Sequence, residues 1–140
     1  MKTIIRIFAI LLITITTSCK AQQMVQTTAD VYKLKSNEQQ FIGKPLKYLL
    51  SEIKPEIKIG VGNNEEGHQF FSFRFLSLDE IKQKVIGRKL VSLYAYVKEP
   101  IDWNFNNRPK GKEHLWTKDD VEKYGNLTVI RIKVIERIED

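Results

Sequence analysis

Polar and hydrophobic residues alternate along four stretches of the chain, and each stretch predicts a β-strand. The first two, at 56–62 and 68–76, are separated by a turn rich in glycine, asparagine and glutamate, which predicts a hairpin. The others are expected at 89–97, which is rich in valine, leucine and tyrosine, and at 127–138, the clearest alternation in the sequence. Hairpin-length turns favour antiparallel pairing of these strands.

The alternation also predicts which side of each strand is buried. The residues expected on the inner side are Ile57, Ile59 and Val61 in the first strand, Phe71, Phe73 and Phe75 in the second, and Thr128, Ile130, Ile132, Val134 and Ile138 in the last. The outer side of the last strand carries Arg131, Lys133 and Arg137. This basic face is either a surface for a partner or a solvated sheet face.

Helical spacing of apolar residues and capping signals predict three helices. The first, over 45–53, begins with a proline and has leucine and isoleucine residues on one side. A short helix over 78–86 begins with the Ser-x-x-Glu spacing of a capping box, and a third runs from its cap Thr117 to Gly125. The residues expected to point inward from the second helix are Ile81, Val85 and Ile86.

These elements predict an α+β fold, with a mostly antiparallel sheet of about four strands and helices packed on one face. The expected order over the single domain 36–140 is α-β-β-α-β-α-β, which lacks the alternation of a doubly wound parallel sheet. A chain of 140 residues is long enough for one such domain.

The first 18 residues have the features of a secretory signal peptide. Lys2 and Arg6 precede an apolar run at 7–13, which ends in threonines before it reaches the length of a membrane-spanning helix. Residues 19–35 are polar and without periodicity, and they are expected to form a tether between the leader and the domain, with Val31, Tyr32 and Leu34 as candidates to dock on the domain at the end of the tether.

The leader ends in Thr16-Thr17-Ser18-Cys19, which resembles the lipobox of bacterial lipoproteins, although Thr16 stands where that family prefers leucine. The resemblance implies that Cys19 receives fatty acyl chains such as palmitate, becomes the first mature residue and anchors the protein in a membrane of the cell envelope. Lys20 follows instead of the aspartate associated with inner-membrane retention, which favours the outer membrane. The alternative is signal peptidase cleavage after Ala21, which would leave the only cysteine unexplained.

The charge and the reactive residues exclude several classes of function. The net charge is +6, and it falls to +4 once Lys2 and Arg6 are removed with the leader; the remaining charges alternate in sign, so nucleic acid is not an expected partner. His68 and His114 lack the spacing of a metal site, so no metal or cofactor is expected. No nucleophile is accompanied by a base in the sequence, so no catalytic residue is assigned.

The segment 99–116 is predicted to be a long loop, and it is the segment best suited to binding a partner. Long loops in small domains are often functional, and aromatic, amide and arginine side chains suit protein or sugar surfaces. The candidate partner-binding residues are Trp103, Phe105, Asn107, Arg108 and Trp116. The alternative is that both tryptophans fold inward and fix the loop over the sheet.

The chain as a whole resembles the many small bacterial cell-envelope lipoproteins that have an α+β domain and no assigned activity. We therefore expect a non-catalytic binding or envelope-structural module, which presents the 99–116 loop to a protein or an envelope glycan. The alternatives are an immunity or inhibitor protein that neutralises an envelope-acting toxin or hydrolase, and an enzyme that uses His68 or His114.

Overall fold

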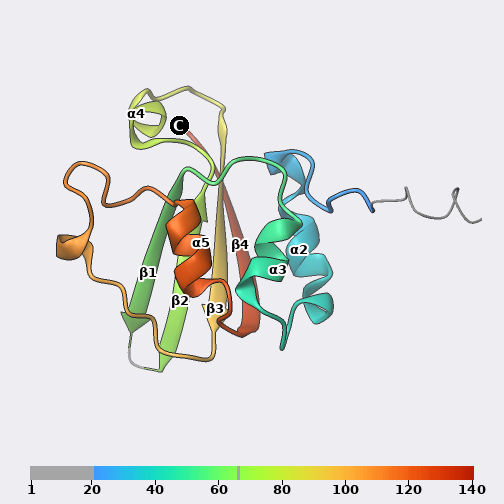
Figure 1. The fold of residues 1–140 in the computed structure, drawn as a ribbon. Helices are drawn as coiled ribbons and strands as arrows, with labels where there is room; N and C mark the ends of the chain where they lie inside the picture. The colour runs from blue at the N-terminus through green and yellow to red at the C-terminus, as the bar shows by residue number, and fades with distance from the viewer. Residues whose placement is uncertain (1–20, 66) are drawn as a thin grey trace, which may run out of the picture.

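The structure, a computed structural model, describes residues 21–65 and 67–140 and contains a four-stranded sheet with helices over one face (Figure 1). The strands are β1 (Ile59–Glu65), β2 (His68–Arg74), β3 (Lys89–Val97) and β4 (Val129–Ile138). They lie side by side in sequence order, and each neighbouring pair is antiparallel. The predicted α+β class and the antiparallel sheet of four strands are confirmed.

The described residues also form four α-helices and three 3₁₀ turns. These are α2 (Tyr32–Ser36), α3 (Leu46–Ser51), α4 (Leu78–Lys82) and α5 (Lys118–Tyr124), with η1 (Thr28–Asp30), η2 (Glu38–Gln40) and η3 (Phe105–Asn107). Figure 1 shows α2, α3 and α5 over the same face of the sheet, whereas α4 lies beyond one end of it. Ser77 and Thr117 cap α4 and α5 as predicted. No helix in these residues combines the length and the apolar character needed to cross a membrane.

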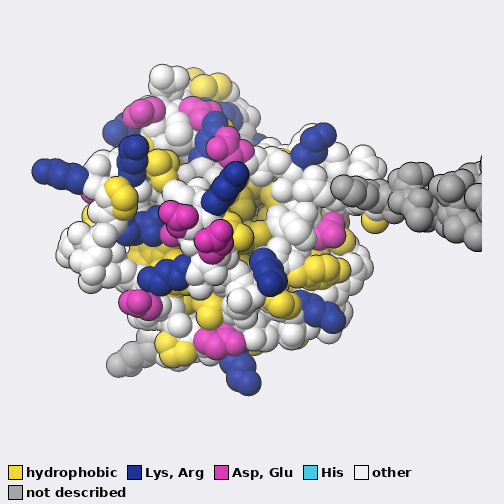
Figure 2. Space-filling model, viewed as in Figure 1, with side chains coloured by type: hydrophobic (Ala, Val, Ile, Leu, Met, Phe, Trp, Pro, Cys, Tyr) yellow, Lys and Arg dark blue, Asp and Glu magenta, His cyan; other side chains and the backbone are white. Residues whose placement is uncertain are grey.

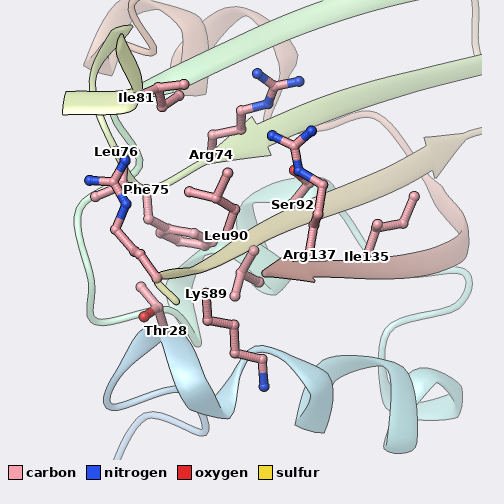
Figure 3. A pocket seen from close by; sticks show the side chains of 12 residues that line it. Thr28, Arg74, Phe75, Leu76, Ile81, Lys89, Leu90, Ser92, Ile135 and Arg137 are labelled. Atoms are coloured by element: carbon pink, nitrogen blue, oxygen red, sulfur yellow. The ribbon is translucent and has the colours of Figure 1, made fainter. Parts of the chain in front are cut away.

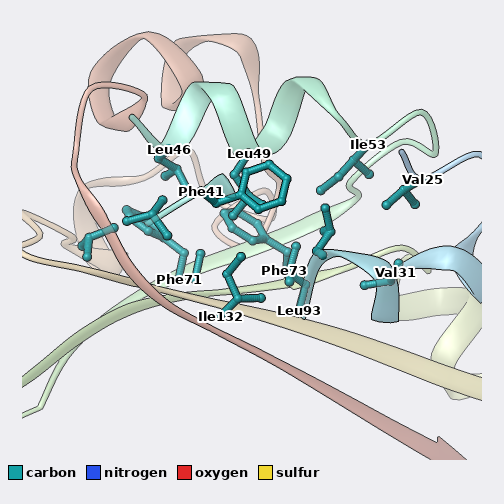
Figure 4. Close-up of a cluster of buried hydrophobic side chains, with 14 of the residues drawn as sticks. Val25, Val31, Phe41, Leu46, Leu49, Ile53, Phe71, Phe73, Leu93 and Ile132 are labelled. Atoms are coloured by element: carbon teal, nitrogen blue, oxygen red, sulfur yellow. The ribbon is translucent and has the colours of Figure 1, made fainter. Parts of the chain in front are cut away.

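The hydrophobic core lies between the helices and one face of the sheet, which we call the covered face; the opposite face is the open face. Figure 4 shows Leu46 and Leu49 of α3 directed toward Phe71, Leu93 and Ile132 of the sheet. All five side chains are fully buried. Burial of a side chain of this size contributes roughly 1.5–3 kcal/mol, so this layer supplies much of the stability of the fold.

The predicted inner side of the first strand is wrong within β1, although Ile57, just before it, packs against the core and Ile59 is buried on the opposite face. Gly60 pairs with Phe73 and Gly62 with Phe71, so the two glycines occupy the covered face and Ile59 and Val61 point the other way. A Cβ atom built on Gly60 would lie 2.5 Å from the Trp116 ring, so an indole fills the space that a strand side chain normally takes. Isoleucine and valine do alternate with other residues in β1, but the apolar side chain that covers this strand on the covered face is Trp116, from a distant part of the chain.

The predicted tether is also wrong over the described residues 21–35, which include η1 and the start of α2, although Val31 and Leu34 do dock on the domain as expected and Tyr32 stays exposed. Val25, Val31 and Leu34 are fully buried in the core, and Val25 pairs with the segment after α3 through hydrogen bonds to Glu52 and Lys54, both of 2.9 Å. Three apolar residues at irregular spacing give no periodic signal in the sequence. Their side chains are nevertheless as deeply buried as those of a regular helix in the core. The predicted signal peptide over 1–18 and Cys19 lie outside the described residues.

Four further residues predicted to point inward are exposed. Ile130 is 48% exposed, because the pairing of β3 with β4 shifts register between Tyr96 and Val97 and places Val129 on the covered face instead. Ile86 is 87% exposed and Val85 is exposed, because α4 ends at Lys82. Ile138, at the last position of β4, is exposed as well.

We predict that Gly60→Ala lowers the free energy of unfolding by about 1–3 kcal/mol, because the added methyl group overlaps the Trp116 ring. Denaturant unfolding of the variant measures this loss. The double variant Gly60→Ala/Trp116→Phe is expected to lose less than the sum of its single variants, since phenylalanine leaves room for the methyl group. A gain in stability for Gly60→Ala, as expected for a glycine in an open strand, would contradict the packing.

Candidate functional site

The 99–116 loop lies along β1 and covers the outer edge of the sheet. At one end the amide of the Asn64 side chain bonds to both backbone groups of Ile101, accepting from Ile101 N at 3.0 Å. At the other end Gly60 N donates to His114 O at 3.0 Å, and Trp116 N donates to Lys58 O at 3.4 Å. The loop thus shields a strand edge that would otherwise be free to pair with another chain.

Both tryptophans of the loop fold inward. Trp116 lies on Gly60 and contacts the Phe73 ring edge-on at 4.9 Å between ring centres, while Trp103 lies on Gly62 and contacts Tyr124 at 5.7 Å. The indole N–H of Trp103 is buried without a hydrogen-bond partner among the described residues. Of the two possibilities that the sequence left open for the tryptophans, the structure shows the one in which they fix the loop over the sheet.

Arg108 holds the loop together from the outside of this aromatic cluster. Its guanidinium lies 4.0 Å above the Trp103 ring and forms a bidentate ion pair with Asp120 of α5, at 2.8 and 2.9 Å. The same guanidinium also donates to the carbonyl oxygens of Glu113 and Leu115, both at 2.7 Å. Planar, bidentate pairing of this kind is the strongest form of side-chain hydrogen bonding.

Asp120 serves the loop and the helix at once. Its carboxylate also accepts from the backbone N–H of Thr117 at 2.9 Å, which completes the N-terminal cap of α5. Burial favours the neutral acid, but the hydrogen bonds from Arg108 and Thr117 outweigh it and lower the pKa of the Asp120 carboxyl below its ordinary value. The ionised pair is therefore part of the folded structure at neutral pH.

Two of the five predicted partner-binding residues remain at the surface. Phe105 is 43% exposed and packs against His114 at 5.1 Å between ring centres, and Asn107 is exposed beside it in η3. The other three make their contacts inside the protein: the rings of Trp103 and Trp116 pack on the sheet, and the guanidinium of Arg108 is hydrogen-bonded to Asp120. The loop therefore offers a partner a much smaller surface than its composition suggests.

The open face of the sheet is the larger surface with side chains suited to binding. Strand pairing brings Phe70 of β2 beside Tyr94 and Tyr96 of β3, at ring-centre distances of 5.9 and 5.1 Å. Arg131 of β4 lies over Tyr96 at 5.3 Å. The three rings are half-buried by one another, and no helix of Figure 1 covers them.

The charges on the open face are positive except at its hairpin end. Four cationic side chains occupy its strand positions: Arg74, Arg131, Lys133 and Arg137. The single carboxylate at a described strand position of this face is Glu65, at the hairpin end of β1. On the helix side, by contrast, basic and acidic side chains are interspersed (Figure 2). A face with cations and few anions attracts negatively charged groups.

The sequence indicated part of this face and missed its centre. The alternation in the last strand predicts the basic residues of β4 as a possible surface, but no pattern along the chain by itself singles out the aromatic residues of β2 and β3. Phe70, Tyr94 and Tyr96 are far apart in the chain, and only the β1-β2-β3-β4 order places them together. An aromatic residue at the outer position of two predicted neighbouring strands is the signal that could have found them.

The described residues contain no group of three His, Cys, Asp or Glu side chains close enough to bind a metal ion. Both histidines instead contact aromatic rings, His68 with Tyr96 and His114 with Phe105. No protein-family model, curated protein or solved structure matches this chain. The functional interpretation therefore depends on the geometry and chemistry of these surfaces.

We predict that Arg108→Ala lowers the free energy of unfolding by about 3 kcal/mol, because it leaves the Asp120 carboxylate buried without its counterion. It should also shift tryptophan fluorescence to longer wavelength as Trp103 becomes hydrated. Both are measured in one denaturant titration followed by fluorescence.

Lys123→Ala is the matched control for the Arg108 variant. Lys123 also pairs with a carboxylate of the neighbouring segment, but both partners are exposed and 3.4 Å apart, so its loss should lower the free energy of unfolding far less than the loss of Arg108. Equal losses in the two variants would show that Arg108 does not fasten the loop.

Proposed function

We propose that this protein is a non-catalytic binding module of the cell envelope, held at a membrane by lipid on Cys19. The lipobox-like leader supports the anchor, because a soluble domain with acyl chains on its first residue stays at the bilayer without a spanning helix. The described domain is compact from Val25 onward, so few residues separate the anchor from the folded part.

The observation that supports a binding role is the open face of the sheet. It combines tyrosine, phenylalanine and arginine side chains, the residue types enriched at protein interfaces and at their energetically dominant positions. The side chains are held by the sheet and by one another, so a partner would order few of them on binding. Antiparallel sheets commonly leave one face to solvent, but that face is then usually polar throughout.

The partner that fits this face best is an acidic protein surface or an envelope glycan with negative charge. Cations around an aromatic centre attract carboxylates by charge, while sugar rings and apolar side chains pack on the tyrosines. The exposed loop residues Phe105 and Asn107, in η3, form a second, smaller candidate contact.

The open face of the sheet also supports the alternative function, that of an immunity or inhibitor protein. Arg131 over Tyr96 is a rigid pair of the kind that dominates tight protein interfaces. An inhibitor would require a target with an acidic surface, since cations on both partners would slow their encounter. A stoichiometric complex with one enzyme or toxin distinguishes this role from glycan binding.

We predict that Tyr94→Ala/Tyr96→Ala abolishes partner binding while Tyr32→Ala does not. The immobilised variants are incubated with solubilised envelope proteins and, separately, with purified envelope glycan, and retained protein and sugar are quantified. Wild type and the Tyr32 variant, whose exposed tyrosine lies on α2, should retain the same ligand at least tenfold better than the double variant. Phe105→Ala is measured in parallel. Loss of retention in that variant alone would move the binding site to the loop, and no retention by wild type would contradict a binding role.

We predict that membrane-extracted wild-type protein begins at Cys19 and carries acyl mass, and that Cys19→Ser removes this mass. Intact-mass spectrometry of both proteins makes the comparison directly. A wild-type protein that begins at Gln22 with no acyl mass would contradict the anchor and leave the binding role to be judged on its own experiment.

A further inference from the structure

A pocket of about 410 Å³ lies at the end of the sheet where β2 stops and β3 begins. Ile81 of α4 lies above it, and the sheet residues that line it from the open face are Arg74, Leu90, Ser92, Ile135 and Arg137 (Figure 3). The volume is within the usual range for small-molecule sites, which runs from roughly 300 to 1,000 Å³. The aromatic centre of the open face lies farther along the same strands, toward the other end of the sheet.

Two arginines of the pocket have no ionic partner among the described residues. Arg74 and Ser92 are paired across β2 and β3, and Arg137 is paired with Leu90 across β3 and β4, so both guanidinium groups rise from the same face beside Ser92 (Figure 3). None of the ion pairs in the described residues includes Arg74 or Arg137. Two adjacent cations repel each other, and an anion between them removes that repulsion.

The other cations of the pocket are already neutralised. Arg88 donates to Glu139 at 2.7 Å and Lys89 pairs with Glu136 at 2.7 Å. The hydrogen bond from Arg88 is the main cause that lowers the pKa of Glu139, with a smaller contribution from the charge of Arg137. Glu139, whose charge Arg137 also influences, is therefore held by another arginine, and the charge that remains in the pocket is positive.

Apart from Thr28 and Ser92, the rest of the lining is apolar. Leu90 and Ile135 form the floor beside the two arginines, and Ile81 extends over them from α4. Water alone satisfies arginine well on an open surface, but apolar walls on two sides favour a ligand that carries an apolar part next to its charge.

We propose that this pocket binds a small organic anion, a phosphate or carboxylate group attached to a short apolar chain or ring. The anionic group lies between Arg74 and Arg137, each of which can donate two parallel hydrogen bonds to its oxygens, and the Ser92 hydroxyl donates a further one. The apolar part packs on Leu90, Ile135 and Ile81. This site is separate from the partner surface proposed above, and neither proposal depends on the other.

Isothermal titration calorimetry with phenyl phosphate tests the proposal on the full chain, held in nanodiscs of zwitterionic phosphatidylcholine. Benzoate, inorganic phosphate and phenol are titrated in parallel. Phenyl phosphate or benzoate should bind at one site per chain, at least tenfold more tightly than inorganic phosphate or phenol. Whichever of the two aromatic anions binds more tightly identifies the anionic group that the pocket prefers. Equal affinity for inorganic phosphate would overturn the apolar part of the proposal, and no binding of either aromatic anion would overturn the site.

Two double variants with the same change in charge separate the pocket from the general charge of the face. Arg74→Gln/Arg137→Gln should weaken binding at least tenfold, whereas Arg131→Gln/Lys133→Gln, on the same face outside the pocket, should change it less than threefold. Thermal unfolding of each variant shows that the fold is retained. Equal losses in the two variants would overturn the pocket in favour of nonspecific attraction. A third variant, Leu90→Asn, keeps both arginines and should reduce the preference for phenyl phosphate over inorganic phosphate.

Discussion

The contact of two indole rings with two glycines is the interaction on which the rest of this structure depends. Gly60 and Gly62 leave β1 without an apolar side chain on the covered face, so a strand at the edge of the sheet has little to bury by itself. Trp103 and Trp116 supply that apolar surface from a loop, and Tyr124 of α5 packs against both rings. The Arg108–Asp120 pair then closes the cluster from outside. The strand β1, the 99–116 loop and the helix α5 therefore stabilise one another through this cluster.

This packing determines which surfaces remain for binding. The loop has the composition of a recognition segment, but its rings and its arginine are already in contact with the protein, so their binding energy stabilises the fold. The open face of the sheet has no helix over it, and its aromatic and cationic side chains point to solvent. The positively charged pocket lies at one end of that face and the tyrosines toward the other. In this small domain the loop tryptophans stabilise the fold, whereas Phe70, Tyr94 and Tyr96 remain accessible on the open face.

Local signals predicted the elements well. The strand at 89–97 has the bounds of β3, and the predicted caps at Ser77 and Thr117 begin α4 and α5, because capping and alternation involve only neighbouring residues. The errors concern which side of an element is buried. Ile130 faces outward because of a register shift against β3, and Ile59 and Val61 leave the covered face because indole rings occupy it. Neither cause is visible within the segment that was misjudged.

The sequence by itself determined the fold class, the antiparallel hairpin and the helix starts, together with the resemblance of the leader to a lipobox, because these depend on spacing along a few consecutive residues. Only the tertiary structure decided that residues 25–34 belong to the core, that the loop tryptophans point inward, and that Phe70, Tyr94 and Tyr96 meet on one face. Each of these involves residues far apart in the chain. Burial and contact at such distances are fixed by strand order and by competition for space in one small core, and no local pattern records either.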